Sequence, residues 1–392
     1  MLQRIKYTLF LKDVFVLALT TFGGAQAHIA HFHKVLVARR GYLSEEDLME
    51  LNSLCQIIPG PTSTQTLTAI GFRLGGPNLA YLTLLVWMLP AVTFMTAAAI
   101  MMSDIQEKSW SLQFTRFILP MAVGIVSYGA YRISLRTVKS KTGGVLMVLA
   151  AVISYLYQTP FVFPAILLGG GLVTAFKYKR LPKNHKEKIV ISWANFALWA
   201  GVLILAATLG AVTGWLPIRI FENFYRNGSL IFGGGQVLTP LLYTEFVEYK
   251  NYLTSSEFLS GYAVAQALPG PVFSFSSYIG SLSMREYGTG GEILGALMAS
   301  FGIFLPGTFL IFFVIRFWEG LKSYRAVRAS LEGITAASAG LVAAAAIIMF
   351  QPLENTVTNY AFTIATFLTL TFTRIPSPVI IACGLLLGFI LK

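Results

Sequence analysis

Two short segments of this 392-residue chain combine a helix break with uncharged polar side chains. They read CQIIPGPTSTQ at 55–65 and AQALPGPVFSF at 265–275. Proline ends the helix that precedes it, and glycine lets the backbone approach a ligand closely. A helix that starts after such a break exposes unpaired N–H groups, which together carry about half a positive charge. The pattern therefore favours the binding of an anion by backbone amides and neutral side chains.

Glycines, amides and hydroxyls around the breaks are the candidate anion ligands. The segments Phe22-Gly-Gly and Phe232-Gly-Gly-Gly predict a further break in each half of the chain. Arg73 lies in an apolar stretch and is a candidate anion partner or gate, with snorkelling of its side chain to the surface as the alternative. The predicted binding residues are Gly23, Gly24, Gln26, Gln56, Gly60, Thr62, Ser63, Thr64, Gln65, Arg73, Gly233, Gly234, Gln236, Gln266, Gly270, Ser274 and Ser276.

Three titratable residues are candidates for proton coupling: His28, Asp47 and Glu257. Ser44 stands three positions before Asp47, and Thr254 stands three positions before Glu257. These spacings match the capping box, in which the acidic side chain closes the start of a helix. Capping is therefore the favoured role of both carboxylates. His28 lies close to the first glycine break and has an ordinary pKa near neutral pH, so it is a candidate to gain and lose a proton there.

The sequence favours neither a metal site nor a cofactor. His28, His31 and His33 have helical spacing, but no cysteine or H-E-x-x-H motif accompanies them. Cys55 and Cys383 lie far apart in apolar surroundings, which excludes a disulfide framework. No Walker motif is present, so we do not expect this chain alone to use ATP.

Composition places the chain in the membrane. Hydrophobic residues make up 55% of it and charged residues only 12%, about half the share that soluble proteins carry. Four uncharged stretches, 79–103, 189–218, 293–315 and 333–353, are long enough to cross a bilayer. The fold class is therefore an all-α polytopic membrane protein. The net charge is +12, and the basic residues lie between the apolar segments. This indicates basic cytoplasmic loops and no nucleic-acid partner.

The chain contains an internal repeat. A shift of 210 positions carries 22–61 onto 232–271 without a gap, and matches Pro59-Gly60-Pro61 to Pro269-Gly270-Pro271. The shift then becomes 216, which matches Leu89-Pro90 to Leu305-Pro306. The predicted division is a first repeat at 1–176, a basic loop with a joining transmembrane helix at 177–210, and a second repeat at 211–392.

Loop charges predict that the second repeat is inverted. The loop DIQEK after 79–103 is slightly acidic, whereas the equivalent loop after 293–315 is basic. Lys and Arg favour the cytoplasmic side, as does the strongly basic segment 177–188. We therefore expect a cytoplasmic amino terminus, an external carboxyl terminus and an inverted-topology repeat, as secondary transporters have.

Each proline-glycine-proline break is expected to be the tip of a re-entrant helical hairpin. About 14 residues precede each break and 62–74 or 272–282 follow it, which is too short to cross the membrane. Such broken helices are tolerated in a bilayer where protein buries them or where they line a water-filled cavity. The alternative is a pair of proline kinks whose hydroxyls pack against neighbouring helices.

The two break regions resemble one known family. FGGAQAHIAHFHKVLVARRGYLSEEDLMELNSLCQIIPGPTSTQ and its copy FGGGQVLTPLLYTEF are similar to the paired signatures of chromate ion transporters, over the full length of the chain. The resemblance implies export of chromate across the bacterial cytoplasmic membrane, energised by the proton-motive force or membrane potential, and chromate resistance. Ala25-Gln26 departs from the glycine and proline found in many members.

Chromate, or a related tetrahedral oxyanion such as sulfate, is thus the expected substrate, with the lipid bilayer as surroundings; the sequence leaves a homodimer open. One alternative is an exporter or channel for another small inorganic anion. Another is an intramembrane enzyme acting on a lipid phosphate. Such an enzyme needs nucleophiles or acid–base groups at membrane depth, whereas the breaks offer mainly amides, hydroxyls and helix ends. We therefore do not expect an enzyme.

Overall fold

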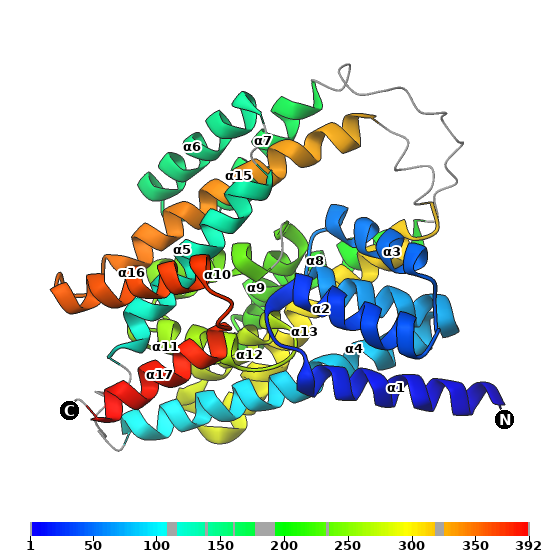
Figure 1. Ribbon diagram of the computed structural model, residues 1–392. Helices are drawn as coiled ribbons and strands as arrows, with labels where there is room; N and C mark the ends of the chain where they lie inside the picture. Colours follow the sequence, from blue (N-terminus) through cyan, green and yellow to red (C-terminus); the bar gives the residue numbers. More distant parts are fainter. Residues whose placement is uncertain are drawn as a thin grey trace. The chain divides into compact units, whose positions relative to one another are not determined.

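The computed structural model describes residues 2–107, 116–137, 140–159, 161–176, 193–232, 235–317 and 325–390. Within these ranges it describes only the backbone of residues 2–5, 26, 106–107, 136–137, 235–236, 325, 327–328 and 389. Helices connected by turns make up the described part of the chain, with no strand in it (Figure 1). This confirms the predicted all-α fold.

Several helices are long and apolar enough to span a membrane. The five found in the described ranges are Thr62–Ile105, Ile118–Leu135, Ala194–Thr213, Arg285–Val314 and Ala329–Phe350. Shorter apolar helices of 10–17 residues accompany them. The chain is therefore a polytopic membrane protein, as its composition predicted.

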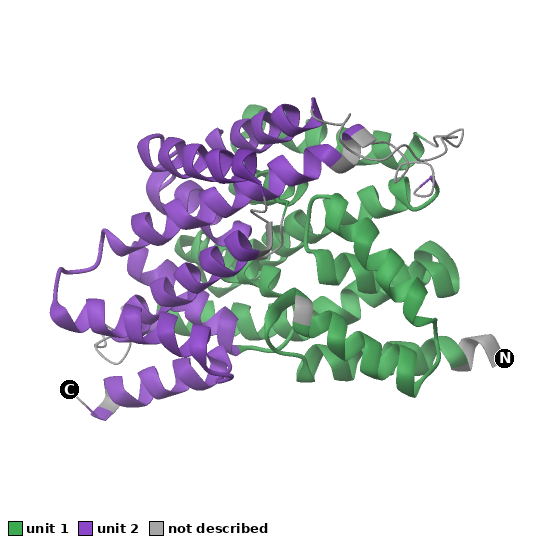
Figure 2. Ribbon diagram, turned by 45° about the horizontal axis from the view of Figure 1, so that its top comes forward, with its two compact units in different colours: residues 1–103, 191–235, 268–316 green, residues 104–190, 236–267, 317–392 purple. Residues whose placement is uncertain are grey.

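The chain divides into two compact units (Figure 2). The first unit comprises 1–103, 191–235 and 268–316. Its helices are α1 (Leu2–Thr20), α2 (Gly24–Phe32), the π-helix η1 (His33–Arg39), α3 (Glu45–Ile57), α4 (Thr62–Glu107, to residue 103), α8 (Ala194–Thr213), α9 (Leu216–Leu230), η5 (Val272–Ser274), α12 (Phe275–Leu282), η6 (Arg285–Tyr287) and α13 (Gly288–Val314). Helix α13 packs against α8, α9 and α12. Trp87, Phe224 and Phe304 are fully buried in this unit.

The second unit comprises 104–190, 236–267 and 317–392. Its helices are α5 (Ile118–Thr137), α6 (Lys141–Leu156), α7 (Val162–Ala175), α10 (Gly235–Tyr243), the π-helix η4 (Thr244–Tyr249), α11 (Ser255–Ala267), α15 (Arg325–Phe350), α16 (Val357–Phe372) and α17 (Ser377–Ile390). Helices α6 and α7 lie along α15 (Figure 1). Glycines make this close approach possible, because a Cβ at Gly170 would lie 2.8 Å from the Gly333 carbonyl oxygen.

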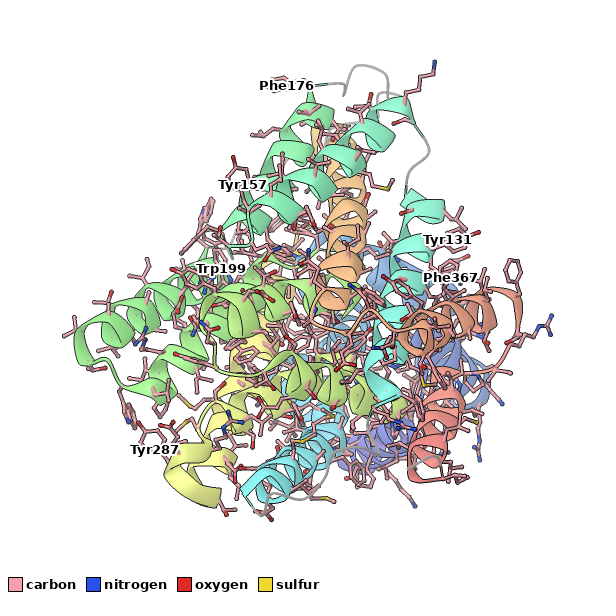
Figure 3. All side chains as sticks on the ribbon, turned by 90° about the vertical axis from the view of Figure 1, so that its left-hand side faces the viewer. Tyr131, Tyr157, Phe176, Trp199, Tyr287 and Phe367 are labelled. Atoms are coloured by element: carbon pink, nitrogen blue, oxygen red, sulfur yellow. The ribbon has the colours of Figure 1, made fainter. Side chains whose placement is uncertain are left out.

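The second unit also contains a helical hairpin, which α6 and α7 form. Helices α6 and α7 are joined by a short turn at 157–161, of which Pro160 lies outside the described residues. Helix α5 packs on α16 through Tyr131 and Phe367, whose ring centroids are 5.7 Å apart (Figure 3). Large apolar side chains of the same unit, such as Tyr157 and Phe176, are exposed, as expected for surfaces that face lipid (Figure 3).

Equivalent helices occur in the two halves, which confirms the internal repeat. Shifted by 210, α3 falls on α11 with the same bounds. Shifted by 216, α6 falls on α16 with the same bounds. The two π-helices also end at equivalent residues, Arg39 and Tyr249. Each compact unit contains helices from both halves, so the division at 1–176, 177–210 and 211–392 stays a prediction about the repeats.

Helix α8 occupies the place of the joining helix predicted within 177–210, although it runs from Ala194 to Thr213 and so ends three residues later. It ends at Gly214, whose φ of 63° suits glycine. The basic segment 177–188 lies outside the described residues. Which side of the membrane each loop faces, and the inversion of the second repeat, stay predictions.

Candidate functional site

The first tip is a sharp break between two short helices. Helix α3 ends at Ile57, Pro59-Gly60-Pro61 forms the break, and α4 begins at Thr62. Gly60 has a φ of 124°, which side chains other than glycine rarely adopt. Helix α4 is interrupted at Gly75 and Gly76, and Gly76 has φ 73° and ψ −166°, a combination confined almost to glycine. The helix after the tip is therefore the short segment 62–74, as predicted.

Two contacts show that α3 and 62–74 are the antiparallel arms of a hairpin. Near the tip, the Cys55 thiol lies within hydrogen-bonding reach of Thr66. At the open end, Arg73 Nη2 lies 2.7 Å from Asp47 Oδ1. Pairs this far apart in sequence on both sides of Gly60 are possible only when the arms run side by side in opposite directions. The first hairpin is thus present, and its re-entrant placement in the membrane stays a prediction.

Asp47 closes the start of α3. The Ser44 hydroxyl accepts from the Asp47 N–H at 3.1 Å, and the Ser44 N–H donates to Asp47 Oδ2 at 3.2 Å. This reciprocal capping box is the predicted one. Hydrogen bonding to Ser44, first to its side chain and then to its backbone, lowers the pKa of Asp47, and Arg73 adds to the effect. Arg73 therefore lies at the open end of the hairpin, away from the tip.

The two tips are bonded reciprocally to the two glycine breaks within the first unit. The Gly60 N–H donates to the Ile231 carbonyl oxygen at 2.7 Å. The Gly270 N–H donates to the Thr21 carbonyl oxygen at 2.9 Å. Thr21 precedes the first Phe-Gly-Gly segment and Ile231 precedes the second, so a shift of 210 converts one bond into the other. Each tip is held by the break of the opposite repeat.

Packing at the tips follows the same reciprocal rule. A Cβ at Gly60 would lie 3.4 Å from the Gly307 Cα, and a Cβ at Gly270 would lie 3.1 Å from the Ala91 Cβ. Ala91 and Gly307 are equivalent residues, each directly after a helix proline. Sequence reasoning missed both, although the Leu-Pro match between 89–90 and 305–306 marks their place.

A buried polar cluster surrounds the first tip. His28 Nδ1 lies 2.9 Å from the Ser63 hydroxyl, and the Trp87 indole N–H donates to the Thr64 hydroxyl at 3.1 Å. The His28 ring meets Trp87 edge to face, with centroids 5.3 Å apart. The structure thus brings together three predicted site residues, His28, Ser63 and Thr64, with Trp87, which sequence reasoning missed.

Gln65 folds back over the tip. Its Nε2 donates to the Pro59 carbonyl oxygen at 2.7 Å. The same nitrogen lies 2.7 Å from where a Cβ would stand at Gly60 and again at Gly307. Both glycines therefore make room for this amide. Gln65 Oε1 and His28 Nε2 are buried and have no hydrogen-bond partner in the described part of the chain.

The second tip is less polar than the first. Its equivalents of His28, Ser63 and Gln65 are Leu238, Phe273 and Phe275. Ser274 Oγ donates to the Pro271 carbonyl oxygen at 2.6 Å, which ties it to its own break. The Ser276 hydroxyl is buried and has no partner among the residues described. Both tips therefore turn at a glycine with positive φ, whereas their side chains differ.

The remaining predicted residues are distributed as follows. Gly23 and Gly24 form the first break with φ of 95° and 77°. Gln56 is exposed on α3, and Thr62 is half-buried at the start of α4. Gly233 and Gly234 lie outside the described residues, as do the side chains of Gln26 and Gln236.

Two predicted residues belong to the second unit, which is described separately. Glu257 caps α11: its Oε2 accepts from the Thr254 N–H at 2.6 Å, and its own N–H donates to Thr254 Oγ1 at 3.2 Å. The backbone carbonyl of Gln266 accepts from Ser377 Oγ at 3.3 Å. Both capping boxes expected from the sequence are therefore confirmed.

Two ion pairs at the ends of the π-helices were missed by sequence reasoning. In the first unit, Arg40 Nη2 lies 2.8 Å from Asp13 Oδ1, and the Tyr42 hydroxyl donates to Asp13 Oδ2 at 2.8 Å. In the second unit, Lys250 Nζ lies 2.8 Å from the fully buried Glu245. Arg40 and Lys250 are equivalent, but their carboxylates come from different helices. The sequence signal for the first ion pair was Asp13, because a carboxylate inside an apolar stretch needs a partner.

No cluster of three potential metal-ligating side chains occurs among the residues described. The histidines at 28, 31 and 33 do not converge there: His28 bonds Ser63, while His33 Nε2 lies 3.5 Å from Glu45. The tip therefore offers backbone amides and neutral side chains as ligands. Such groups bind an anion without neutralising it by an opposite charge.

Several known proteins are similar to this chain over most of its length. A chromate transport protein of Cupriavidus metallidurans is 24% identical over 98% of this chain and 93% of its own length. One of Pseudomonas aeruginosa is 28% identical over 85% of this chain and 78% of its own length. An uncharacterized transporter of Methanocaldococcus jannaschii is 22% identical over 96% and 92%. No solved structure matches the chain.

The family comparison covers both halves of the repeat. The sequence model of the family described as "Chromate transporter" matches residues 8–175 and again 218–389. Both matched regions contain a glycine break, a capping box and a proline-glycine-proline tip. The chain belongs to the chromate transporter family.

Proposed function

We propose that this chain exports chromate from the cytoplasm across the bacterial inner membrane and thereby confers chromate resistance. The observation that carries the proposal is the reciprocal bonding of the tips, in which Gly60 pairs with Ile231 and Gly270 pairs with Thr21. This arrangement gathers both tips and the residues preceding both glycine breaks in one compact unit. Broken helices whose ends meet in this way form the substrate sites of many secondary transporters.

The first tip has the chemistry for an oxyanion. The N–H groups of Thr62, Ser63 and Thr64 open the half-helix 62–74, where the helix dipole favours negative charge. The named neighbours of the tip, among them His28, Trp87 and Gln65, are neutral or can be neutral. A site of neutral donors binds an anion yet releases it, because no opposite charge has to be separated from it at each turnover.

The membrane potential supports export as the direction. Each negative charge that leaves a cytoplasm held at negative potential gains about 2.3 kcal/mol per 100 mV. The potential alone therefore drives an anion outward, and a proton exchanged inward adds to the driving force. His28 is the proton-coupling candidate in this proposal, because Asp47 and Glu257 close helix ends in capping boxes.

The two tips have separate roles in this proposal. The first tip, with Gln65, Ser63 and Thr64, contacts the anion. The second tip, with Gly270, Ser274 and Ser276, supports the path, together with Gln56 on the helix before the first tip. Arg73 acts as part of a clasp at the open end of the first hairpin, since its partner is Asp47 at 2.7 Å.

Uptake of chromate into everted membrane vesicles tests the proposal. Vesicles from cells that express the chain, energised by respiration, are expected to accumulate chromate above vesicles from cells without it. Right-side-out vesicles from the same cells provide the matched control for direction. Accumulation in right-side-out vesicles alone would assign import instead of export. Absence of chromate movement in both would leave another small inorganic anion as the substrate.

A further inference from the structure

The orientation of the Gln65 amide is fixed by chemistry. Its Nε2 lies 2.7 Å from the Pro59 carbonyl oxygen, which can only accept a hydrogen bond. Exchanging nitrogen and oxygen would bring two acceptors together, so the nitrogen must face Pro59. Gly60 and Gly307 confine the same amide from both sides. Gln65 Oε1 is therefore the atom left over at the tip, and it is an acceptor.

A buried hydrogen-bond acceptor is unusual at a site for anions, because it requires a donor. Gln65 is 2% exposed and its Oε1 has no partner in the part of the chain described. Leaving such an atom without a donor costs about 1–3 kcal/mol. A fully deprotonated oxyanion offers only acceptors and cannot satisfy it. An oxyanion that carries one proton has an O–H group that can.

A second buried atom completes the binding pattern. His28 is 1% exposed, and with Nδ1 engaged by Ser63 its Nε2 has no partner among the described residues. When the Ser63 hydroxyl donates to Nδ1, Nε2 carries the ring proton and is a donor. The tip then has donors, from His28 and the first amides of the half-helix, and one acceptor, from Gln65.

We infer that the first tip binds the oxyanion in its singly protonated form, with Gln65 Oε1 accepting the proton of the anion; the inference rests on the proposed transport of chromate. Hydrogen chromate loses its proton close to neutral pH, so protonated and deprotonated forms are both present there, whereas sulfate, of the same shape, is fully deprotonated. One buried acceptor thus lets the site discriminate between two ions of similar shape. A site built to bond an O–H group rejects an analogue that lacks it, because its own polar group stays unpaired.

Other titratable groups near the tip could also produce a dependence on pH. The groups on the elements packed around Gln65 are His28 on α2 and Cys55 on α3. Between about pH 6 and pH 8 the imidazole is the group whose ordinary pKa falls in range. A test must therefore separate titration of His28 from titration of the substrate.

The wild-type measurement uses the full chain in proteoliposomes at a clamped potential with equal pH on both sides. Above the pKa of hydrogen chromate, the apparent KM for total chromate is expected to rise about tenfold per pH unit, with little change in kcat. Sulfate in large excess is expected to leave chromate transport unchanged. A KM that is flat with pH, or sulfate that competes as well as chromate binds, overturns the inference. Absence of chromate transport at every pH would instead refute the proposed function.

Variants assign the effect to Gln65. Gln65→Met keeps the length of the side chain and removes the acceptor, so the KM is expected to lose its pH slope and sulfate to become a competitor. Gln351→Met is the matched control, because Gln351 bonds the Tyr155 hydroxyl at an exposed site of the second unit. His28→Gln removes the imidazole and is expected to keep the slope at lower affinity; loss of the slope in this variant overturns the inference. The wild-type profile decides the question even if Gln65→Met does not fold.

Discussion

Trp87 donates its indole N–H to the Thr64 hydroxyl across 3.1 Å, and this bond fastens the two parts of α4 together. The half-helix 62–74 and the long part 77–107 run back along each other from the turn at Gly75 and Gly76. A Cβ at Gly71 would lie 2.5 Å from Thr83 Oγ1, so the two parts touch closely near the turn as well. Trp87 thus determines how firmly the half-helix that starts at the tip is held.

Replacing Trp87 by phenylalanine is expected to weaken transport. Trp87→Phe keeps an aromatic ring and removes the N–H donor to buried Thr64, which should lower the free energy of unfolding by about 1 kcal/mol. Trp199→Phe is the matched control: the indole of Trp199, a residue labelled in Figure 3, donates to Ser229 Oγ at 3.0 Å, between α8 and α9. Thermal unfolding should respond similarly in both variants, and only Trp87→Phe should lower chromate transport. Equal transport in both would show that the bond is merely structural.

The tip glycines are expected to tolerate no side chain. Gly60→Ala would place a Cβ 2.7 Å from Gln65 Nε2 at a φ of 124°, and Gly270→Ala would place one 3.1 Å from Ala91 at a φ of 98°. Strain of this kind costs about 1–3 kcal/mol, so each variant should reach the membrane with strongly reduced transport. Gly201→Ala on α8, where a Cβ meets nothing within 4 Å, should transport normally. Normal transport by both tip variants would exclude the proposed path.

The clasp between Arg73 and Asp47 is expected to affect turnover more than binding. Arg73 follows Thr62 by eleven residues, which is about 16 Å along a helix. Arg73→Gln should therefore change kcat and leave the KM for chromate almost unchanged. The side chains are 48% and 29% exposed, so the pair should contribute less than about 1 kcal/mol to stability. A large rise in KM would instead make Arg73 a direct partner of the anion.

The pH range of this clasp follows from the lowered pKa of Asp47. A carboxyl group whose pKa is lower in the folded state stabilises that state above its unfolded value, which is about 3.9. The contribution is lost as the pH falls through the lower, folded value. The difference in thermal stability between wild type and Arg73→Gln should therefore persist at neutral pH and shrink in acid below about pH 4. A difference that already shrinks near neutral pH would contradict this assignment.

Topology is expected to place the two ends of the chain on opposite sides of the membrane. In a variant that lacks Cys55 and Cys383, single cysteines at Lys183 and Lys392 are labelled from outside intact cells with a membrane-impermeant reagent. Only the cysteine at position 392 should react, because the basic segment 177–188 favours the cytoplasm. Labelling of permeabilised cells provides the control for reactivity. Equal external labelling would refute the inverted repeat.

Local features of this fold could be predicted from the sequence, whereas contacts between distant segments could not. Proline, glycine and the capping residues Ser44 and Thr254 fix where helices start and end, and the bounds of α3 and α11 follow from them. The reciprocal bonds at Gly60 and Gly270 join residues more than 170 positions apart, and no local rule specifies such a pairing. The same holds for Arg73: an isolated arginine predicts a charge, and only the antiparallel hairpin gives it Asp47 as a partner.

The charge moved in each turnover is the last prediction, and it connects the driving force to the bound species. Export of an anion with one charge gains about 2.3 kcal/mol at 100 mV, which sustains roughly a fiftyfold concentration ratio. Two charges gain about 4.6 kcal/mol and sustain more than a thousandfold ratio. Since Gln65 Oε1 favours a protonated anion, chromate accumulation in proteoliposomes at a clamped potential should approach the smaller ratio at equal pH on both sides. Collapsing the potential with valinomycin and potassium should abolish accumulation, and a ratio near the larger value would show that two charges move in each turnover.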